Sequence, residues 1–315
     1  MRSRREGSDK INRLTALESA PDEQYALALD FLEREKGLQV VQAALRVLAE
    51  HPRRDAHPAV RRQYAFRDAD GNRRDPGGYI RSDLLKILRQ PAHPDDLPLF
   101  ERGAWTYEFM PGADEVCSSV RANAVIAMSE VDPALASYHC VRLLTDRHTS
   151  KMSGEPAVTA ARILASQSRF LPLYAYVMGD GAASEAVSEC LRSLTSLPES
   201  LLTPLIEKLQ KSEDEIALIG LFDLILGHPA SAAHHEFVRR FLRATRLEDV
   251  HRYLVTAIVA QRKQGLIADL IDQATEEANR RKQENLLDAL SLIDGDARAA
   301  AAVRTLRTAL QRRPG

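Results

Sequence analysis

The chain has 315 residues, of which 44% are hydrophobic, and a formal net charge of -1 at pH 7. This composition supports a large core and excludes both a disordered polymer and a protein whose whole surface is adapted to nucleic acid or anionic lipid. The sequence shows no apolar run long enough for a signal peptide or a membrane span. We therefore expect a cytoplasmic protein that makes no membrane contact.

A helical period runs through most of the sequence. Apolar residues recur at spacings of three and four in QYALALDFLERE, VRANAVIAMSEV and EIALIGLFDLIL, whereas sustained alternation suited to strands is absent. The prolines of Asp132-Pro133 and Leu197-Pro198 predict helix starts, where a missing amide hydrogen costs nothing. The pattern predicts an all-α fold of many short helices. Turn residues separate them: Gly37, Pro52, Pro58, Gly77, Gly78, Pro133, Pro156, Pro198, Pro229, Gly265 and Gly295.

The helices also repeat. Six segments carry a β-branched anchor residue near a helix start, with apolar residues about four and eight positions later. Each anchor helix follows another amphipathic segment, so the repeating unit is predicted to be a helical hairpin. The anchors are Ile80, Val120, Val158, Val187, Ile216 and Val250, which stand 40, 38, 29, 29 and 34 residues apart.

Motifs that carry chemistry are few. The three cysteines, Cys117, Cys140 and Cys190, are scattered and odd in number, so neither a disulfide framework nor a zinc site is indicated. The sequence has no GxSxG, no phosphate-binding glycine loop and no HExxH. His234 and His235 are expected at a helix start, with no third metal ligand in view. We expect no enzymatic activity, no cofactor and no metal.

The segment DADGNRRD, residues 68–75, resembles the start of a calcium-binding loop. An EF-hand needs glycine at its sixth position and glutamate at its twelfth, but counting from Asp68 these positions are Arg73 and Tyr79. We interpret the segment as a polar turn before the glycine pair at residues 77–78.

The centre of the chain is similar to a HEAT repeat. In SSVRANAVIAMSEVDPALASYHCVRLLTD, residues 118–146, the pair Val120-Arg121 begins the second helix of one unit and Asp132-Pro133 opens the next. GYIRSDLLKIL and EPAVTAARILA are less faithful copies. The resemblance implies an all-α, right-handed α-solenoid of stacked antiparallel helix pairs, whose second helices line a concave face.

This architecture divides the chain into three parts. Residues 1–20 are expected to form a basic, partly flexible segment. Residues 21–293 are expected to form about seven helical hairpins, and residues 294–315 a capping helix and tail. Apolar side chains are predicted to be buried between the stacked hairpins: Leu84, Val125, Leu221 and Leu254.

Three long connections, residues 68–78, 105–115 and 146–155, are predicted to lie side by side. Each joins the two helices of a hairpin, and equivalent connections emerge on the same edge of a solenoid. We expect these loops to pack on one another, to bind a partner, or both. The candidate partner-binding residues are Trp105, Tyr107, Phe109, Met110, His148, Lys151, Met152, Arg73 and Arg74. The charge pairs expected to form inter-repeat ladders are Asp75 with Arg81 and Asp114 with Arg121.

Two functions are open at this level. We favour a non-enzymatic, monomeric scaffold that presents a concave groove and the ridge of loops to a protein partner. The alternative is a DNA-binding protein or DNA glycosylase similar to the HEAT-like alkylpurine glycosylases, in which Trp105 with Glu108 or Asp114 would surround the damaged base. Those enzymes use more than one tryptophan in the cleft, and the sequence has one. Nucleic-acid binding, expected to be weak, would use a basic second repeat: Arg53, Arg54, Arg61, Arg62, Arg67, Arg73 and Arg74.

Overall fold

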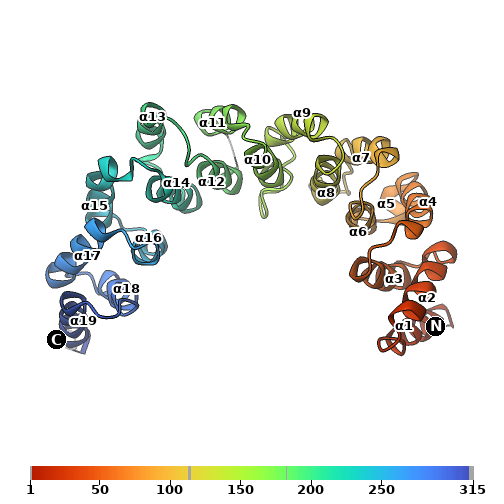
Figure 1. The fold of residues 1–315 in the computed structure, drawn as a ribbon, viewed down its shortest axis with the longest axis horizontal. Helices are drawn as coiled ribbons and strands as arrows, with labels where there is room; N and C mark the ends of the chain where they lie inside the picture. The colour runs from red at the N-terminus through yellow and green to blue at the C-terminus, as the bar shows by residue number, and fades with distance from the viewer. Residues whose placement is uncertain (1, 113–114, 182, 312–315) are drawn as a thin grey trace. The chain divides into compact units, whose positions relative to one another are not determined.

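The computed structural model describes residues 2–112, 115–181 and 183–311, and over these residues the chain is all-α (Figure 1). This confirms the predicted all-α class. The β pairing within the described residues is a single bridge between Phe109 and Glu115. None of the helices in this part of the chain combines the length and the apolar content of a membrane span. The chain divides into two compact units, Met1–Gln167 and Ser168–Gly315.

The first unit consists of two rows of helices. In one row α3, α6, α8 and α10 contact one another in order, and in the other α2, α4, α7 and α9 each pack on one of them (Figure 1). Helix α1 lies in the amino-terminal segment and packs on α2 and α3, with Leu14 buried. The helices are α1 (Arg2–Thr15), α2 (Pro21–Arg34), α3 (Leu38–Glu50), α4 (His57–Asp68), α5 (Gly71–Arg74), α6 (Tyr79–Leu88), α7 (Leu97–Ala104), α8 (Ser118–Ser129), α9 (Pro133–Leu144) and α10 (Ala157–Ser166), with short 3-10 turns η1 (Arg54–Ala56) and η2 (Pro94–Asp96).

The second unit is built in the same way. Helices α12, α14, α16 and α18 contact one another in order, while α11 packs on α12, α13 on α14, and α17 and α19 on α18. Its elements are α11 (Phe170–Met178), α12 (Ser184–Ser193), α13 (Glu199–Leu209), α14 (Glu215–Gly227), η3 (Ser231–His234), α15 (His235–Ala244), α16 (Glu248–Ala260), α17 (Gln264–Glu276), α18 (Arg280–Leu290) and α19 (Ala297–Gln311).

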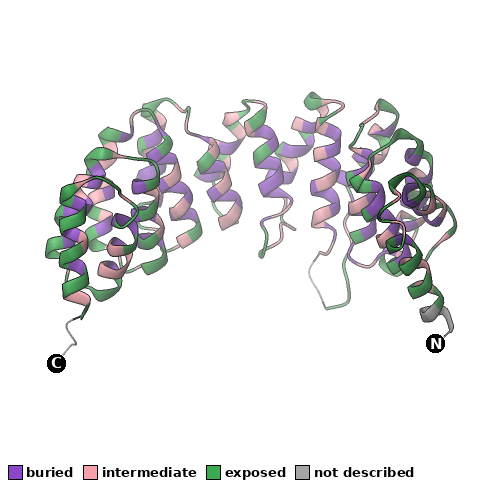
Figure 2. Ribbon diagram, turned by 60° about the horizontal axis from the view of Figure 1, so that its bottom comes forward, coloured by how far each residue is buried: buried purple, intermediate pink, exposed green. Residues whose placement is uncertain are grey.

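The core of each unit lies where the helix faces meet, as the distribution of buried residues in Figure 2 shows. Leu84, Val125, Leu221 and Leu254 are all fully buried, which confirms their predicted positions. Each stands at the helical spacing that keeps apolar side chains on the face toward the neighbouring helices. The apolar period of the sequence is therefore a reliable guide to which helix faces pack.

Side chains of one helix also cap the carboxyl end of an earlier one. Gln63 of α4 donates to the Leu32 carbonyl oxygen of α2 at 2.6 Å, and Arg142 of α9 donates to the Ala104 carbonyl oxygen of α7 at 2.6 Å. In the second unit, Lys208 of α13 caps the end of α11 in the same manner. The last carbonyl groups of a helix have no partner within it and carry partial negative charge, so these donors satisfy them and join adjacent helices.

The predicted anchor Ile216 stands near a helix start as expected, as the second residue of α14, but its side chain is 42% exposed. Asp214 accepts a hydrogen bond from the backbone N–H of Ala217 at 3.0 Å, so α14 begins at Glu215. The later positions of the pattern, Gly220 and Leu224, are buried, together with Ala217 and Leu221.

Two other local predictions differ from the structure. Gly265, read as a turn residue, is the second residue of α17, because its neighbours supply a continuous helical face. Pro198 precedes the first residue of α13 instead of occupying it, whereas Pro133 begins α9 as predicted. Asp132 caps α9 by accepting from the backbone N–H of Leu135 at 2.9 Å.

Candidate partner-binding loop edge

Three connections form one edge of the first unit, which we call the loop edge: residues 69–79, 105–117 and 145–156. They join α4 to α6, α7 to α8, and α9 to α10, with the short helix α5 inside the first. The first two touch at Gly71, where an added Cβ would stand 1.9 Å from Oε1 of Glu108. The second and third touch where the rings of Phe109 and His148 meet, 5.0 Å apart. The prediction that these connections lie side by side is confirmed.

Arg81 joins the first connection to the second. It is fully buried on α6, and its Nη1 and Nη2 donate to Oε1 and Oε2 of Glu108 at 2.5 and 2.8 Å. Its Nε donates to Asp75 at 3.1 Å, which confirms that predicted pair, and Nη1 lies 3.4 Å from Asp68. Burial alone would lower the pKa of Arg81, but the hydrogen bonds to Glu108 and Asp75 and the charge of Glu108 raise it. The guanidinium therefore stays charged.

Arg121 joins the second connection to the third, as Arg81 joins the first to the second. It is fully buried on α8, with Nη2 2.8 Å from Glu115 and Nε 3.2 Å from Asp146. Nη1 donates to the Thr106 carbonyl oxygen at 2.9 Å, and the guanidinium lies 4.1 Å from the centre of the Tyr107 ring. The partner predicted for Arg121, Asp114, lies outside the described residues. The two buried arginines thus hold all three connections.

The contacts of Trp105 lead to α9. Its ring lies 3.7 Å from the guanidinium of Arg142 and meets the ring of His139 edge to face at 6.3 Å. Arg142 also donates to the Tyr107 hydroxyl at 2.8 Å, and that hydroxyl donates to Asp146 at 2.8 Å. Trp105 is therefore connected to the rest of the loop edge through Arg142 and Tyr107, and its ring remains half exposed beside α9.

Cys117 is buried beside the Arg81 cluster. Its thiol lies 3.5 Å from Oε2 of Glu108 and 3.7 Å from Nη2 of Arg81. Burial raises the pKa of the thiol to about 12, because the thiolate would lose its hydration, and this outweighs the favourable charge of Arg81. A thiol that stays protonated is a poor nucleophile, so Cys117 acts as a packing residue.

Large apolar side chains are exposed along the whole loop edge. Tyr79 stands at the end of the first connection, Phe109 and Met110 lie in the second, and Met152 in the third is 93% exposed. Large exposed apolar side chains gathered on one surface are characteristic of protein-binding sites. Phe109, Met110 and Met152 were predicted from the sequence, whereas Tyr79 was missed. Tyr79 directly follows two glycines, and its ring lies against the first of them, Gly77, where an added Cβ would stand 2.7 Å from Cε2 of Tyr79.

The remaining predicted residues differ in how accessible they are. Arg73 and Lys151 are exposed. Arg74 donates to the Phe66 carbonyl oxygen at 2.8 Å and lies 4.4 Å from the Phe66 ring centre, so its charge is held against α4. His148 is half buried and contacts the aromatic rings of the second connection. Arg73 and Lys151 therefore face solvent, while Arg74 and His148 mainly hold the loops together.

The basic residues of the predicted second repeat are largely engaged within the chain. Arg61 donates to Asp96 at 2.6 Å, and buried Arg67 donates to the backbone carbonyl oxygens of Lys36 and Arg74. The other arginines of this group that have a carboxylate or carbonyl partner are Arg53, Arg62, Arg73 and Arg74. Arg53, Arg54, Arg62 and Arg73 are nevertheless exposed to solvent, whereas Arg67 is buried.

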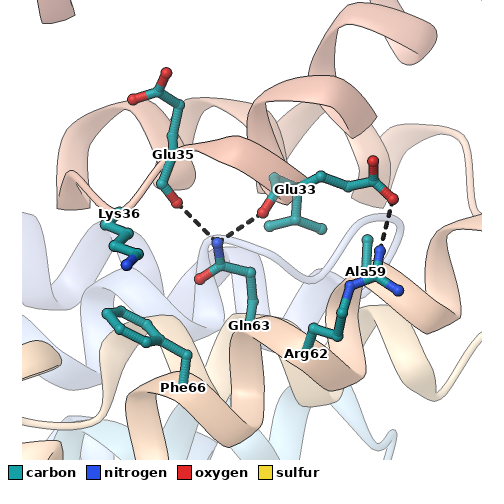
Figure 3. A pocket seen from close by; sticks show the side chains of 8 residues that line it. Glu33, Glu35, Lys36, Ala59, Arg62, Gln63 and Phe66 are labelled. Carbon is teal, nitrogen blue, oxygen red and sulfur yellow. Dashed lines mark hydrogen bonds and ion pairs between the residues drawn. The ribbon is translucent and has the colours of Figure 1, made fainter.

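A shallow pocket lies between α2 and α4, with a volume of about 180 Å³. Figure 3 shows the amide nitrogen of Gln63 directed at carbonyl oxygens that end α2, including that of Glu35 at 2.8 Å. Arg62 and Glu33 form an ion pair at 2.6 Å on one side, and Phe66 lines the other. The pocket is smaller than the roughly 300 Å³ typical of ligand sites. Its polar groups mainly hold α2 against α4.

Metal-binding arrangements do not emerge among the described residues, where no group of three or more His, Cys, Asp or Glu side chains is placed to hold an ion. The acidic residues of the calcium-like segment, Asp68 and Asp75, are paired with Arg81. His234 ends η3 and His235 begins α15, so the predicted helix start is correct. Burial lowers the pKa of both imidazoles, which are neutral at pH 7.

Comparisons with family models, with curated proteins and with solved structures give no match to this chain. Function is therefore inferred from the residues of the loop edge.

Proposed function

We propose that this protein is a non-enzymatic interaction scaffold of the HEAT-like α-solenoid type, and that its loop edge binds a protein partner. The single observation that carries the proposal is that Arg81 and Arg121 fix three connections that expose apolar side chains, including Phe109 and Met152. Exposed apolar surface normally reduces solubility. Apolar side chains that are held exposed in a defined geometry therefore favour a role in partner binding.

The rigidity of the loop edge supports binding over mere packing. A loop that is ordered before association loses less conformational entropy when a partner arrives, so more of the contact energy appears as affinity. The carboxylates of Asp75 and Asp146 supply this order, because each pairs with a buried arginine. Aromatic and methionine side chains are the types enriched at protein interfaces.

The solenoid part of the proposal rests on the two rows of helices within each unit. Each helix pair contacts its neighbours in the row, as in stacked repeats. The cytoplasmic location and the monomeric state stay predictions from the sequence. The DNA-directed alternative has less support, because Glu108 is bound by Arg81 while Trp105 lies against α9, so its candidate residues have separate partners.

The proposal is tested by affinity capture from the organism's own lysate, followed by mass spectrometry. We expect the double variant Phe109→Ala/Met152→Ala to lose partners that the wild type retains. Leu171→Ala/Leu292→Ala is the matched control, because both leucines are exposed apolar residues of the second unit. If the loop-edge variant and the wild type capture the same proteins in the same amounts, the loop edge is not the binding surface.

A further inference from the structure

Among the described residues of the loop edge and of the end of α4, most carboxylates are covered, while the most exposed charges are basic. The carboxylates of Asp68, Asp75, Glu115 and Asp146 have side chains between 2% and 9% exposed, and each lies against a buried arginine, whereas the side chain of Asp70 is 37% exposed. Glu108, whose two oxygens are bound by Arg81, is 14% exposed. The negative charges of the covered residues are thus directed inward and neutralised by Arg81 and Arg121.

The basic residues point the other way. Within the described residues of the loop edge, the charged residues that are exposed to solvent are Arg73, Arg147 and Lys151, one from the first connection and two from the third. The side chain of Arg73 is 85% exposed, with Asp70 3.9 Å away. The surface offered to a partner therefore combines exposed positive charge with the apolar side chains of Tyr79, Phe109, Met110 and Met152.

We propose that the loop edge binds an acidic protein segment that carries apolar side chains. This inference rests on the proposed function and specifies its partner. The apolar side chains of such a segment would contact Phe109, Met110 and Met152, while its carboxylates would approach Arg73, Arg147 and Lys151. Complementary charge around an apolar contact raises the association rate and selects against basic partners. A symmetric contact between the loop edges of two copies does not fit, because it would bring two basic surfaces together.

A protein segment fits this surface better than a nucleic acid. Single-stranded nucleic acids bind by stacking successive bases on aromatic rings along a basic groove. Here the most exposed apolar side chain is the thioether of Met152, and Met110 stands beside Phe109. Flexible methionine side chains adapt to aliphatic and aromatic partners of varied shape, as protein-binding surfaces require.

Synthetic peptides of equal length test the inference by fluorescence anisotropy. One alternates acidic residues with Leu and Phe, a second replaces the acidic residues by Lys, and a third keeps them but replaces Leu and Phe by Ser. We expect the first to bind at least about tenfold more tightly than either of the others. This preference is expected to shrink as ionic strength rises from about 0.01 M to about 0.15 M, because exposed charges are screened.

Variants assign the effect to the loop edge. Arg73→Glu/Arg147→Glu/Lys151→Glu should remove the preference for the acidic apolar peptide. The control Lys211→Glu/Arg243→Glu/Arg246→Glu makes the same charge change at exposed positions of the second unit and should retain it. The first variant changes residues of the loop edge alone. A loss of the preference in this variant and not in the control therefore locates the binding surface.

Three results would overturn the inference. Equal binding of the acidic and basic apolar peptides would refute the charge preference. If the two apolar peptides bound equally and Phe109→Ala/Met152→Ala weakened the binding of both, the proposed function would stand, but the preference for an acidic partner would not. Absence of binding by all peptides would refute the inference of an acidic partner. The proposed function would still be tested separately by capture from lysate. Tighter binding of a single-stranded oligonucleotide than of any peptide would assign the surface to nucleic acid.

Discussion

Arg81 binds both carboxylate oxygens of Glu108, with Nη1 2.5 Å from Oε1 and Nη2 2.8 Å from Oε2, although the two residues are 27 positions apart in the chain. Arg81 lies on α6, and its side chain reaches the connection between α7 and α8. One side chain therefore links two successive helix pairs. Neither group has much access to water. The charge of each residue is therefore balanced chiefly by protein groups, and the position of the second connection depends on this pair.

Replacing Arg81 by methionine is expected to destabilise the first unit by about 3–5 kcal/mol, because Asp75 and Glu108 would keep buried charges without their partner. Methionine retains much of the volume, so the loss reflects charge more than a cavity. Urea unfolding measures the change in the free energy of unfolding. Amide exchange is expected to accelerate first in residues 71–77 and 105–112.

Arg252→Met is the matched control for this experiment. Arg252 and Asp249 form an ion pair at 2.8 Å whose side chains are both well exposed to solvent. Such pairs contribute about 0–1 kcal/mol, because water and salt screen them. Equal effects of the two substitutions would show that the Arg81 cluster is no stronger than a surface pair.

Leu84→Ala is expected to cost about 2–5 kcal/mol, because it leaves a cavity among fully buried side chains. The first unit should lose amide-exchange protection around α4, α6 and α8 before the second unit does, since its helices mainly contact near neighbours. Leu254→Ala in α16 should give the converse pattern. Uniform loss of protection across both units after either substitution would contradict this local stacking.

The sequence alone predicts the helices and most of the core, because apolar periodicity determines which face of a helix can be buried. Ile216 is an exception in burial alone: it stands in the first turn of α14, beside the cap Asp214, and is exposed, while Gly220 and Leu224 of the same pattern are buried. Apolar spacing therefore indicates the buried face of a helix without specifying every residue of its first turn.

The loop edge is predicted only in part. Adjacent connections follow from the repeat, and Asp75 lies only six residues before Arg81, so the sequence suggests both the adjacency and the pair. The contact of Arg81 with Glu108 joins different helix pairs, and no spacing rule specifies which distant carboxylate an arginine will reach. Trp105 illustrates the same difficulty, since its contacts with His139 and Arg142 depend on how α7 packs beside α9.

Gly220→Ala is expected to destabilise the second unit by about 1–3 kcal/mol. Gly220 lies where α14 crosses α12, and a Cβ there would stand 2.5 Å from the Cα of Ser188 and 2.8 Å from its carbonyl oxygen. The helices would have to separate, and this outweighs the gain of up to about 1 kcal/mol in helix propensity. Urea unfolding of the variant measures the balance.

Gly265→Ala provides the comparison, because Gly265 also lies in a helix of the second unit. A Cβ at this position would meet the ring of His235 at 3.6 Å, an ordinary contact distance. We expect this substitution to be neutral or to stabilise the protein by up to about 1 kcal/mol. If Gly220→Ala were equally harmless, the close approach of α12 and α14 would not depend on glycine.

His251 is expected to make the stability of the second unit decrease with falling pH. The imidazole is fully buried on α16, with Nδ1 3.2 Å from the amide nitrogen of Asn285. Burial, helped by the positive charge of Lys282, lowers its pKa from 6.5 to about 4, while Glu277 acts weakly in the opposite direction. Between pH 6.5 and about 4 the unfolded chain therefore binds a proton that the folded chain excludes, and stability is lost progressively across this range.

His251→Asn isolates this effect from the other histidines, because the asparagine side chain can accept from Asn285 but does not titrate. Urea unfolding at pH 7.5 and pH 5 is expected to show a larger loss of stability for the wild type than for the variant, even if the variant is less stable at both values. His139, His234 and His235 also have lowered pKa values and remain in both proteins, so their contribution cancels in the comparison. The same loss in both proteins would mean that the pKa of His251 is not lowered in the folded state.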